Sequence, residues 1–306
     1  MSAEVPVKPE IVSPVAAPEE LARAARPWDG VASLFSDRRA KVGLVWTLLI
    51  VLLALLGPFF APHAPSTIVG APYAGSGSGA LLGTDYLGED ILSRVLYGGR
   101  SVVWMSVSAT VLGVTIGSAI GLIGGYMRNW IDDLIVWGMD IGLAFPQIVF
   151  VLLFIALLGR SEVLIVVLVG IGWVPVAGRM ARSVTLEIVN AEFVEAAEMM
   201  GFPRWRILVR EILPSTLTPI LVQTGGILTW TIGIIAGLSF LGDGIQPPNA
   251  DWGLMINENF DGITIQPWSV IGPIVCIAIY ALATNTLAEG VSRSVAGIDS
   301  GTEGMS

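Results

Sequence analysis

Six long apolar stretches constrain this chain more than any other feature of its sequence. A bilayer core about 30 Å thick is crossed by a helix of about 20 residues, and six stretches meet or nearly meet that length. They cover residues 42–60, 102–125, 134–158, 163–181, 217–241 and 268–287. Only 13% of the 306 residues are charged and mean hydropathy is +0.75, unlike a soluble domain, in which about 25% of residues are charged. The sequence therefore predicts an all-α integral membrane protein with six transmembrane helices.

Basic and aromatic residues predict how the chain sits in the membrane. Of the sixteen Lys and Arg residues, thirteen fall on the side that holds both termini and the loop between spans four and five. Cytosolic loops carry such an excess of basic residues, so both termini are predicted to be cytosolic. Trp130, Trp252 and Trp268 stand near predicted span ends, where indole rings favour the membrane interface.

The segments outside the spans set the predicted domain boundaries. Residues 1–33, rich in Pro, Ala and Glu, are predicted to be a disordered cytosolic tail, and 34–61 an uncleaved first transmembrane helix. Proline and glycine interrupt 62–83, so 62–100 is predicted to be an extracytoplasmic loop. Residues 101–292 would form a core with the other five helices, and 293–306 a second cytosolic tail.

The inventory of reactive side chains argues against an enzyme. His63 is the only histidine and lies in the Pro-rich external segment, so paired-histidine zinc sites are excluded and no metal site is expected. A phosphate-binding loop needs Gly-Lys followed by Ser or Thr, but Lys8 and Lys41 are followed by Pro9 and Val42. We therefore expect this chain to bind no cofactor, and if it is an active pump, its energy must arrive from another protein. No basic cluster interleaved with aromatic residues supports nucleic-acid binding.

Four glycines mark one face of the second predicted span. Because they are spaced four apart, they form a single stripe along a helix, which lets another backbone approach closely. Tight packing within the subunit is the simpler explanation, and contact with a partner membrane subunit is the alternative. The stripe consists of Gly113, Gly117, Gly121 and Gly125.

The loop between spans four and five has the pattern of a helix, a turn and a second helix. Residues 192–200 have helix-forming composition with acids in the first turn, Gly201 provides a stop, and Pro203 can start the next helix. Four residues at helical spacing form one apolar face, namely Phe193, Ala196, Ala197 and Met200. On the residues alone, this face could pack on the chain's own body or dock into a groove of another protein.

The same loop, residues 192–214, resembles a family signature. Its Glu195-Ala196-Ala197, Gly201 and Leu213-Pro214 are similar to the EAA loop of binding-protein-dependent ABC import permeases, although Glu211 stands where Ile is usual. Other motifs, in a resemblance that runs from about residue 34 to 299, narrow it to the C-type permease of the dipeptide, oligopeptide and nickel transporters. These motifs are Leu82-Gly83-Thr84-Asp85, Leu92-Ser93-Arg94, Ala144-Phe145-Pro146, Ser239-Phe240-Leu241-Gly242, Gln246-Pro247-Pro248 and Trp252-Gly253-Leu254-Met255. Glu89, Asp243 and the C-terminus, which lacks a basic ending, depart from the family pattern.

The resemblance implies a permease subunit of a bacterial inner membrane that forms half of a translocation path. Its implied partners are a B-type permease, two ATP-binding subunits that carry ATP and Mg, and an extracytoplasmic substrate-binding protein. The short helix of the loop would dock on an ATP-binding subunit and act as a lever. The implied coupling residues are Glu192, Phe193, Glu195, Ala196, Ala197, Met200 and Gly201.

A polar, Pro-rich region just outside span five is a second candidate site. It would form an outer gate or contact the binding protein, and an ordinary re-entrant turn is an equal alternative. Its candidate residues are Asp243, Gln246, Pro247, Pro248 and Trp252.

Two functions of other classes compete with the permease hypothesis. Asp140 is a carboxylate within span three, which an ion- or proton-coupled carrier could use. It lies about two turns from the predicted cytosolic end, however, where a snorkelling or hydrogen-bonded carboxylate fits better. A membrane scaffold without a transport role is the other alternative. The cargo is not determined, because peptides, nickel, glutathione and other small solutes use similar permeases.

Overall fold

The computed structural model describes residues 38–77 and 79–296; the predicted tail over 1–33 and the end of the C-terminal tail lie outside them. Most of the described chain is helical, and its remaining segments contribute only isolated bridges, such as Ile68 with Glu89. The elements are α3 (Arg38–Phe60), α4 (Ile91–Met127), α5 (Trp130–Ala144), α6 (Gln147–Leu158), α7 (Glu162–Ile188), α8 (Glu192–Met199), α9 (Arg204–Ile207), η1 (Leu208–Ile212), α10 (Leu213–Phe240), α11 (Trp252–Asn259), η2 (Phe260–Gly262) and α12 (Trp268–Ala296).

Five helices within the described residues are long and apolar enough to cross a membrane, and the bent pair of α5 and α6 makes a sixth crossing if it counts as one. The prediction of an all-α membrane protein with six spans is confirmed. Large apolar side chains of α3 are exposed, with Val45 and Leu48 each 54% exposed. Such a surface suits contact with lipid chains.

The predicted continuous helix over 134–158 is wrong, because the chain bends by 83° between α5 and α6. Pro146 has no N–H to donate, and its ring disfavours helical backbone at the preceding residue. Phe145 is accordingly extended, with φ −98° and ψ 131°. The third span is therefore two short helices that meet at an angle.

Two other predicted boundaries shift. Helix α4 begins at Ile91 instead of residue 102, so the predicted external loop over 62–100 ends in a helix. Asp90 caps that helix, because its carboxylate accepts the N–H groups of Leu92 and Ser93. Helix α7 continues to Ile188 instead of residue 181, so Arg182, which lies just beyond the predicted fourth span, belongs to the same helix as Arg179.

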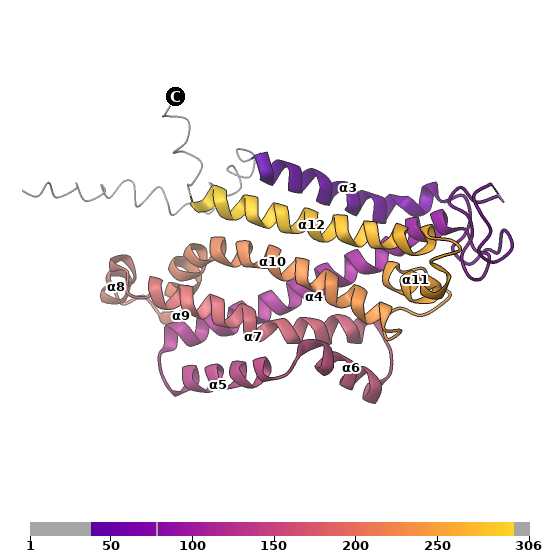
Figure 1. Ribbon diagram of the computed structural model, residues 1–306. Coiled ribbons are helices and arrows are strands. Elements are labelled where there is room, and N and C mark those ends of the chain that lie inside the picture. Colours follow the sequence, from indigo (N-terminus) through magenta and orange to yellow (C-terminus); the bar gives the residue numbers. More distant parts are fainter. Residues whose placement is uncertain (1–37, 78, 297–306) are drawn as a thin grey trace, which may run out of the picture.

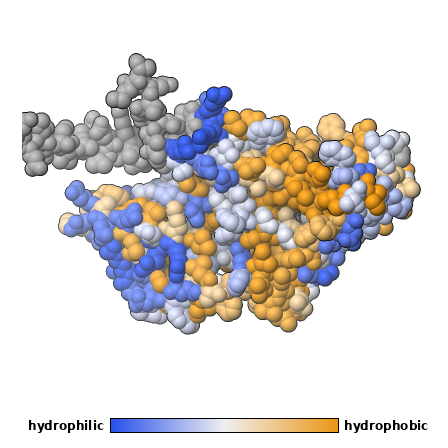
Figure 2. Space-filling view, in the orientation of Figure 1, coloured by the Kyte–Doolittle hydropathy of each residue, from blue (hydrophilic) through white to orange (hydrophobic). Residues whose placement is uncertain are grey.

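The helices lie roughly side by side, with α3 and α12 along one side of the bundle and α5 and α6 along the other (Figure 1). Helices α10, α4 and α7 lie between them. Helix α8 stands at one end of the bundle, and α11 lies at the other end near the segment that follows α3. On the face in Figure 2, hydrophilic residues gather at the α8 end, and hydrophobic residues cover much of the remainder.

Candidate functional site

Helix α8 is attached to the bundle by one buried side. Val194 and Ala197 are only 1% and 3% exposed. They pack in a hydrophobic cluster with Leu122 of α4, Ile207 of α9 and Ile212 of η1. Close packing of these side chains anchors α8 to α4, α9 and η1.

The opposite side of α8 is open. Phe193 is 45% and Met200 65% exposed, and Ala196 is exposed between them. The predicted four-residue apolar face is therefore wrong in one member, because Ala197 belongs to the buried side. Val194, which the sequence analysis missed, lies three residues before Ala197 and so shares its side of the helix. Burial of these two side chains leaves an exposed stripe that consists of Glu192, Phe193, Glu195, Ala196, Met199 and Met200.

Gly201 ends α8 as the sequence analysis expected of a helix stop. Its φ is +77°, a left-handed conformation that side-chain-bearing residues rarely adopt. The Gly201 N–H donates to the Glu198 carbonyl at 2.9 Å, and the Phe202 N–H donates to the Ala197 carbonyl at 3.2 Å. This pair of bonds is a Schellman motif, which turns the chain sharply toward α9.

The glycine stripe of α4 lies against α7 of the same chain. A Cβ atom on Gly113 would lie 2.5 Å from the Gly170 carbonyl oxygen, and one on Gly121 would lie 2.2 Å from that of Gly178. Gly117 and Gly125 approach α7 in the same way. The structure thus places the stripe in packing within the subunit, and the two helices are held backbone to backbone.

The candidate outer-gate residues separate into two groups. Arg160, between α6 and α7, pairs with Asp243 at 2.9 Å and with the Gln246 side-chain oxygen at 3.4 Å. Pro247 and Pro248 are exposed in the turn that follows. The outer turns after α6 and α10 are therefore joined by one arginine, which gives the unusual Asp243 a partner.

Trp252 does not belong with these exposed residues. It is fully buried, and its indole N–H donates to the Val95 carbonyl at 2.8 Å. Its ring packs so closely on α4 that a Cβ on Gly99 would lie 2.6 Å from it. The expectation that Trp252 lies at the membrane interface is wrong, because the ring fills the gap that small residues leave between α11 and α4.

Two ion pairs join α5 to α7. Arg179 pairs with Asp140, and Arg182 donates two hydrogen bonds, of 2.6 and 2.7 Å, to the carboxylate of Asp132. From its position in the sequence, Asp140 was expected to be a snorkelling or hydrogen-bonded carboxylate more than a proton relay, and Arg179 provides the hydrogen-bond donor. Arg179 was not predicted as that partner, because the sequence alone does not show which helices lie side by side.

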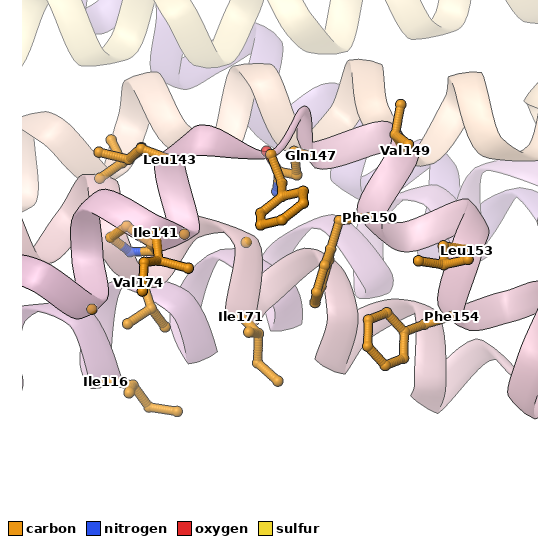
Figure 3. A pocket seen from close by; sticks show the side chains of 16 residues that line it. Ile116, Ile141, Leu143, Gln147, Val149, Phe150, Leu153, Phe154, Ile171 and Val174 are labelled. Atoms are coloured by element: carbon orange, nitrogen blue, oxygen red, sulfur yellow. The ribbon is translucent and has the colours of Figure 1, made fainter.

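An apolar cavity of about 810 Å³ lies where α5, α6 and α7 meet. In Figure 3, Phe150 and Phe154 lie at one end of it and Ile141 and Val174 at the other. The two phenyl rings pack against each other with their planes tilted by 52° and their centroids 4.8 Å apart. Gln147 contributes a polar side chain to the lining, and its amide donates to the Val169 carbonyl at 3.0 Å. The bend at Pro146 creates this cavity because it turns α6 away from the line of α5.

At the end of the bundle that carries α11, Arg94 is buried among three carboxylates. Its guanidinium pairs with Asp85 and, at 2.7 Å each, with Glu89 and Glu258. Because Glu258 comes from α11, this arginine ties the segment before α4 to a distant helix. Burial raises the pKa of Glu89, an effect that Arg94 opposes and the other two carboxylates reinforce. The predicted exposed loop is therefore partly a folded, buried structure.

Replacing Glu89 by glutamine tests this arrangement. Because the pKa of Glu89 is raised above its ordinary 4.5 in the folded state, its ionisation weakens the folded state as the pH rises through the folded-state pKa. The melting temperature of Glu89→Gln relative to the native protein should therefore increase by a few degrees between about pH 4 and pH 7. Scanning calorimetry in detergent measures it. A relative decrease over this range would show that the pair with Arg94 outweighs burial.

Residues 113–297 match the family model described as the binding-protein-dependent transport system inner membrane component, which is more than half of the chain. The chain belongs to this family of transport permeases. Residues 27–74 also match the N-terminal transmembrane domain of oligopeptide transport permease C. The resemblance in the sequence analysis is thus confirmed, and the permease is of the C type.

Individual relatives extend over nearly the whole permease. A dipeptide transport system permease protein of Alkalihalophilus pseudofirmus is 34% identical, over 90% of this chain and 91% of its own. A glutathione transport system permease protein of Pectobacterium atrosepticum is 33% identical, over 87% and 89%. Among solved structures, the inward-facing MetNI methionine ABC transporter matches with a TM-score of 0.52 at 17% identity, over 65% of this chain and 96% of that chain, which shows a shared fold.

These similarities establish the class of protein. The chain is a permease subunit of an ABC importer, a multi-pass protein of a bacterial inner membrane, and not itself an enzyme. Permeases of this class work with a partner permease, ATP-binding subunits and a substrate-binding protein. The permease hypothesis is thereby favoured over an independent carrier and over a membrane scaffold.

Proposed function

We propose that this permease forms half of the translocation path of an importer for short peptides, with glutathione, itself a peptide, included in that class. The names of the two relatives described above support the cargo class. The other half of the path would be a B-type permease. An extracytoplasmic substrate-binding protein would deliver the cargo at the end of the bundle that carries α11. The ion pair of Arg160 with Asp243 and the buried ion pairs of Arg94 lie at that end.

The observation that carries this proposal is the two-sided character of α8. Val194 and Ala197 attach it to the bundle, while Phe193, Ala196 and Met200 are left exposed on a helix only two turns long. An exposed apolar stripe rimmed by acids is the surface that a helix presents to a groove in a partner. The groove would belong to one of two ATP-binding subunits, and α8 would transmit its closure to α4 and α10.

ATP and Mg would be bound by those partner subunits. Lys8 and Lys41 both lie in sequence contexts that a phosphate-binding loop cannot use. The movement driven by ATP would therefore enter this chain through α8. That end of the bundle, together with both termini, would face the cytosol. The excess of basic residues on that side supports the same orientation.

Reconstitution of the co-expressed complex tests the proposal. The permease should co-purify with a second permease and two ATP-binding subunits, and proteoliposomes should take up a dipeptide only with ATP and the binding protein present. Uptake by this chain alone under a proton or sodium gradient would contradict the proposal and favour a carrier.

A further inference from the structure

A charged pair borders the apolar cavity on the side nearer α8. Asp140 directly precedes three cavity-lining residues of α5, and Arg179 follows the cavity-lining part of α7 by about one turn. The two side chains form an ion pair across the helices. The cavity residues adjoining the pair are Gly138, Ile141, Gly142, Val174, Pro175 and Val176.

The exposure of this pair indicates which way the surface faces. Asp140 and Arg179 expose 51% and 52% of their side chains. Asp140 lies roughly 12 Å along α5 from Asp132, and Arg179 lies at least as far from the end of α7 at Ile188, so both lie well inside the bundle from its α8 end. Ionisable groups at such depth face a bundle interior or a water-filled space, because contact with hydrocarbon is costly. This face therefore lines an aqueous path.

The chemistry of the surface matches one class of solute. The cavity is of the size that holds a small ligand, and its lining is mainly apolar, with Phe150 and Phe154 packed against each other at the far end. A short peptide brings apolar side chains together with an ammonium group and a carboxylate. If the ion pair opens, Asp140 can accept the ammonium and Arg179 can hold the carboxylate, so that no charge is left without a partner.

We infer that Asp140 and Arg179 are specificity-determining residues that bind the two charged termini of a zwitterionic short peptide during its passage, while the cavity between α5, α6 and α7 holds its side chains. This inference rests on the proposed import function and names the recognition site within it. The exchange of one ion pair for two keeps the site neutral before and after the solute passes. The site thus selects for solutes that carry both charges.

The test uses the complete importer in proteoliposomes with its own binding protein and three probes: leucyl-leucine, N-acetyl-leucyl-leucine and leucyl-leucinamide. Asp140→Asn should reduce uptake of the two probes with a free ammonium at least about tenfold relative to the acetylated probe. Arg179→Gln should reduce uptake of the two probes with a free carboxylate relative to the amide by a similar factor. Because the binding protein is the same throughout, its own preferences cancel in the ratio of variant to native uptake.

Matched controls separate recognition from structure. Asp133→Asn, at an exposed acid on the same helix, should leave the three uptake ratios unchanged. Equal loss for all three probes in both variants, with recovery in the Asp140→Arg plus Arg179→Asp double variant, would mean that the pair only clamps the helices and would overturn the inference. Failure of the native importer to take up leucyl-leucine at all would overturn the proposed cargo and this inference together.

A side chain added to Gly138 tests which occupant fills the cavity. Gly138 lines it, and a Cβ at this position meets no atom within 4 Å. Gly138→Leu should block uptake of leucyl-leucine while the complex still assembles, and Gly138→Ala should have a much smaller effect. Failure of Gly138→Leu to assemble with the second permease would assign the cavity to a helix of that partner and contradict the inference.

Discussion

Replacing Ala196 by arginine is expected to reduce substrate-stimulated ATP hydrolysis by the assembled importer at least about tenfold, while the permease still inserts into the membrane. Ala196 is exposed on α8 between Phe193 and Met200, so the new side chain causes no clash within the chain. In the proposed groove of the ATP-binding subunit, however, a long charged side chain would be buried without a partner. Stimulation of ATP hydrolysis by loaded binding protein in proteoliposomes measures the effect.

Two further substitutions make this result specific. Asn190→Arg adds the same charge in the exposed turn before α8 and should leave the stimulation near the native level. Ala197→Asp would also abolish coupling, but through folding, because Ala197 is 3% exposed in the cluster that anchors α8. Full stimulation in Ala196→Arg would contradict docking through the exposed stripe of α8.

Replacing Gly121 by alanine is expected to destabilise the permease by about 1–3 kcal/mol or more, although alanine is the better helix former. The added Cβ would lie 2.2 Å from the Gly178 carbonyl oxygen and 2.9 Å from the Arg182 nitrogen, both in the backbone of α7. Backbone atoms cannot rotate away as a side chain can, so α4 and α7 must separate. Thermal unfolding in detergent, or the yield of folded protein, measures the loss.

The matched control is the same change in α10. A Cβ on Gly226 or Gly233 meets no atom within 4 Å, so Gly226→Ala and Gly233→Ala should be neutral or stabilising by up to about 1 kcal/mol through helix propensity. If all three variants melt alike, the close approach of α4 and α7 is not what stabilises the bundle. Such a result would return the stripe to the alternative, contact with a partner subunit.

Local features were predictable where a single residue type enforces a local geometry. Gly201 was expected to stop a helix, and its positive φ shows why glycine is needed there. Pro146 carried an equally local signal, because proline disfavours a helix before it, yet the apolar run around it outweighed that signal in the span assignment. The predicted apolar face of α8 combined residues from its two sides for a different reason, since Val194, Ala196 and Ala197 are all suited to an apolar face and only neighbouring elements decide which of them are buried.

Partners across helices could not be predicted in this way. Arg94 forms an ion pair with Glu258, although more than half of the sequence separates the two residues. Trp252 is buried on α4, although its position near a span end suggested the membrane interface. Arg160 and Asp243 likewise lie on separate connections. Each of these contacts depends on how helices rotate about their own axes, and an isolated apolar stretch contains little information about that rotation.

The sequence by itself determined the class of the molecule, the number of crossings and the position of the helix-turn-helix loop over residues 192–214, because the length of an apolar run, a family motif and a helix-stop glycine are each confined to a short stretch of chain. Only the tertiary structure decided which side of α8 is open and that Asp140 pairs with Arg179 beside a cavity. The physical reason is that helices in a membrane are oriented by close packing of small residues and by pairing of buried charges, and both depend on residues far apart in the chain.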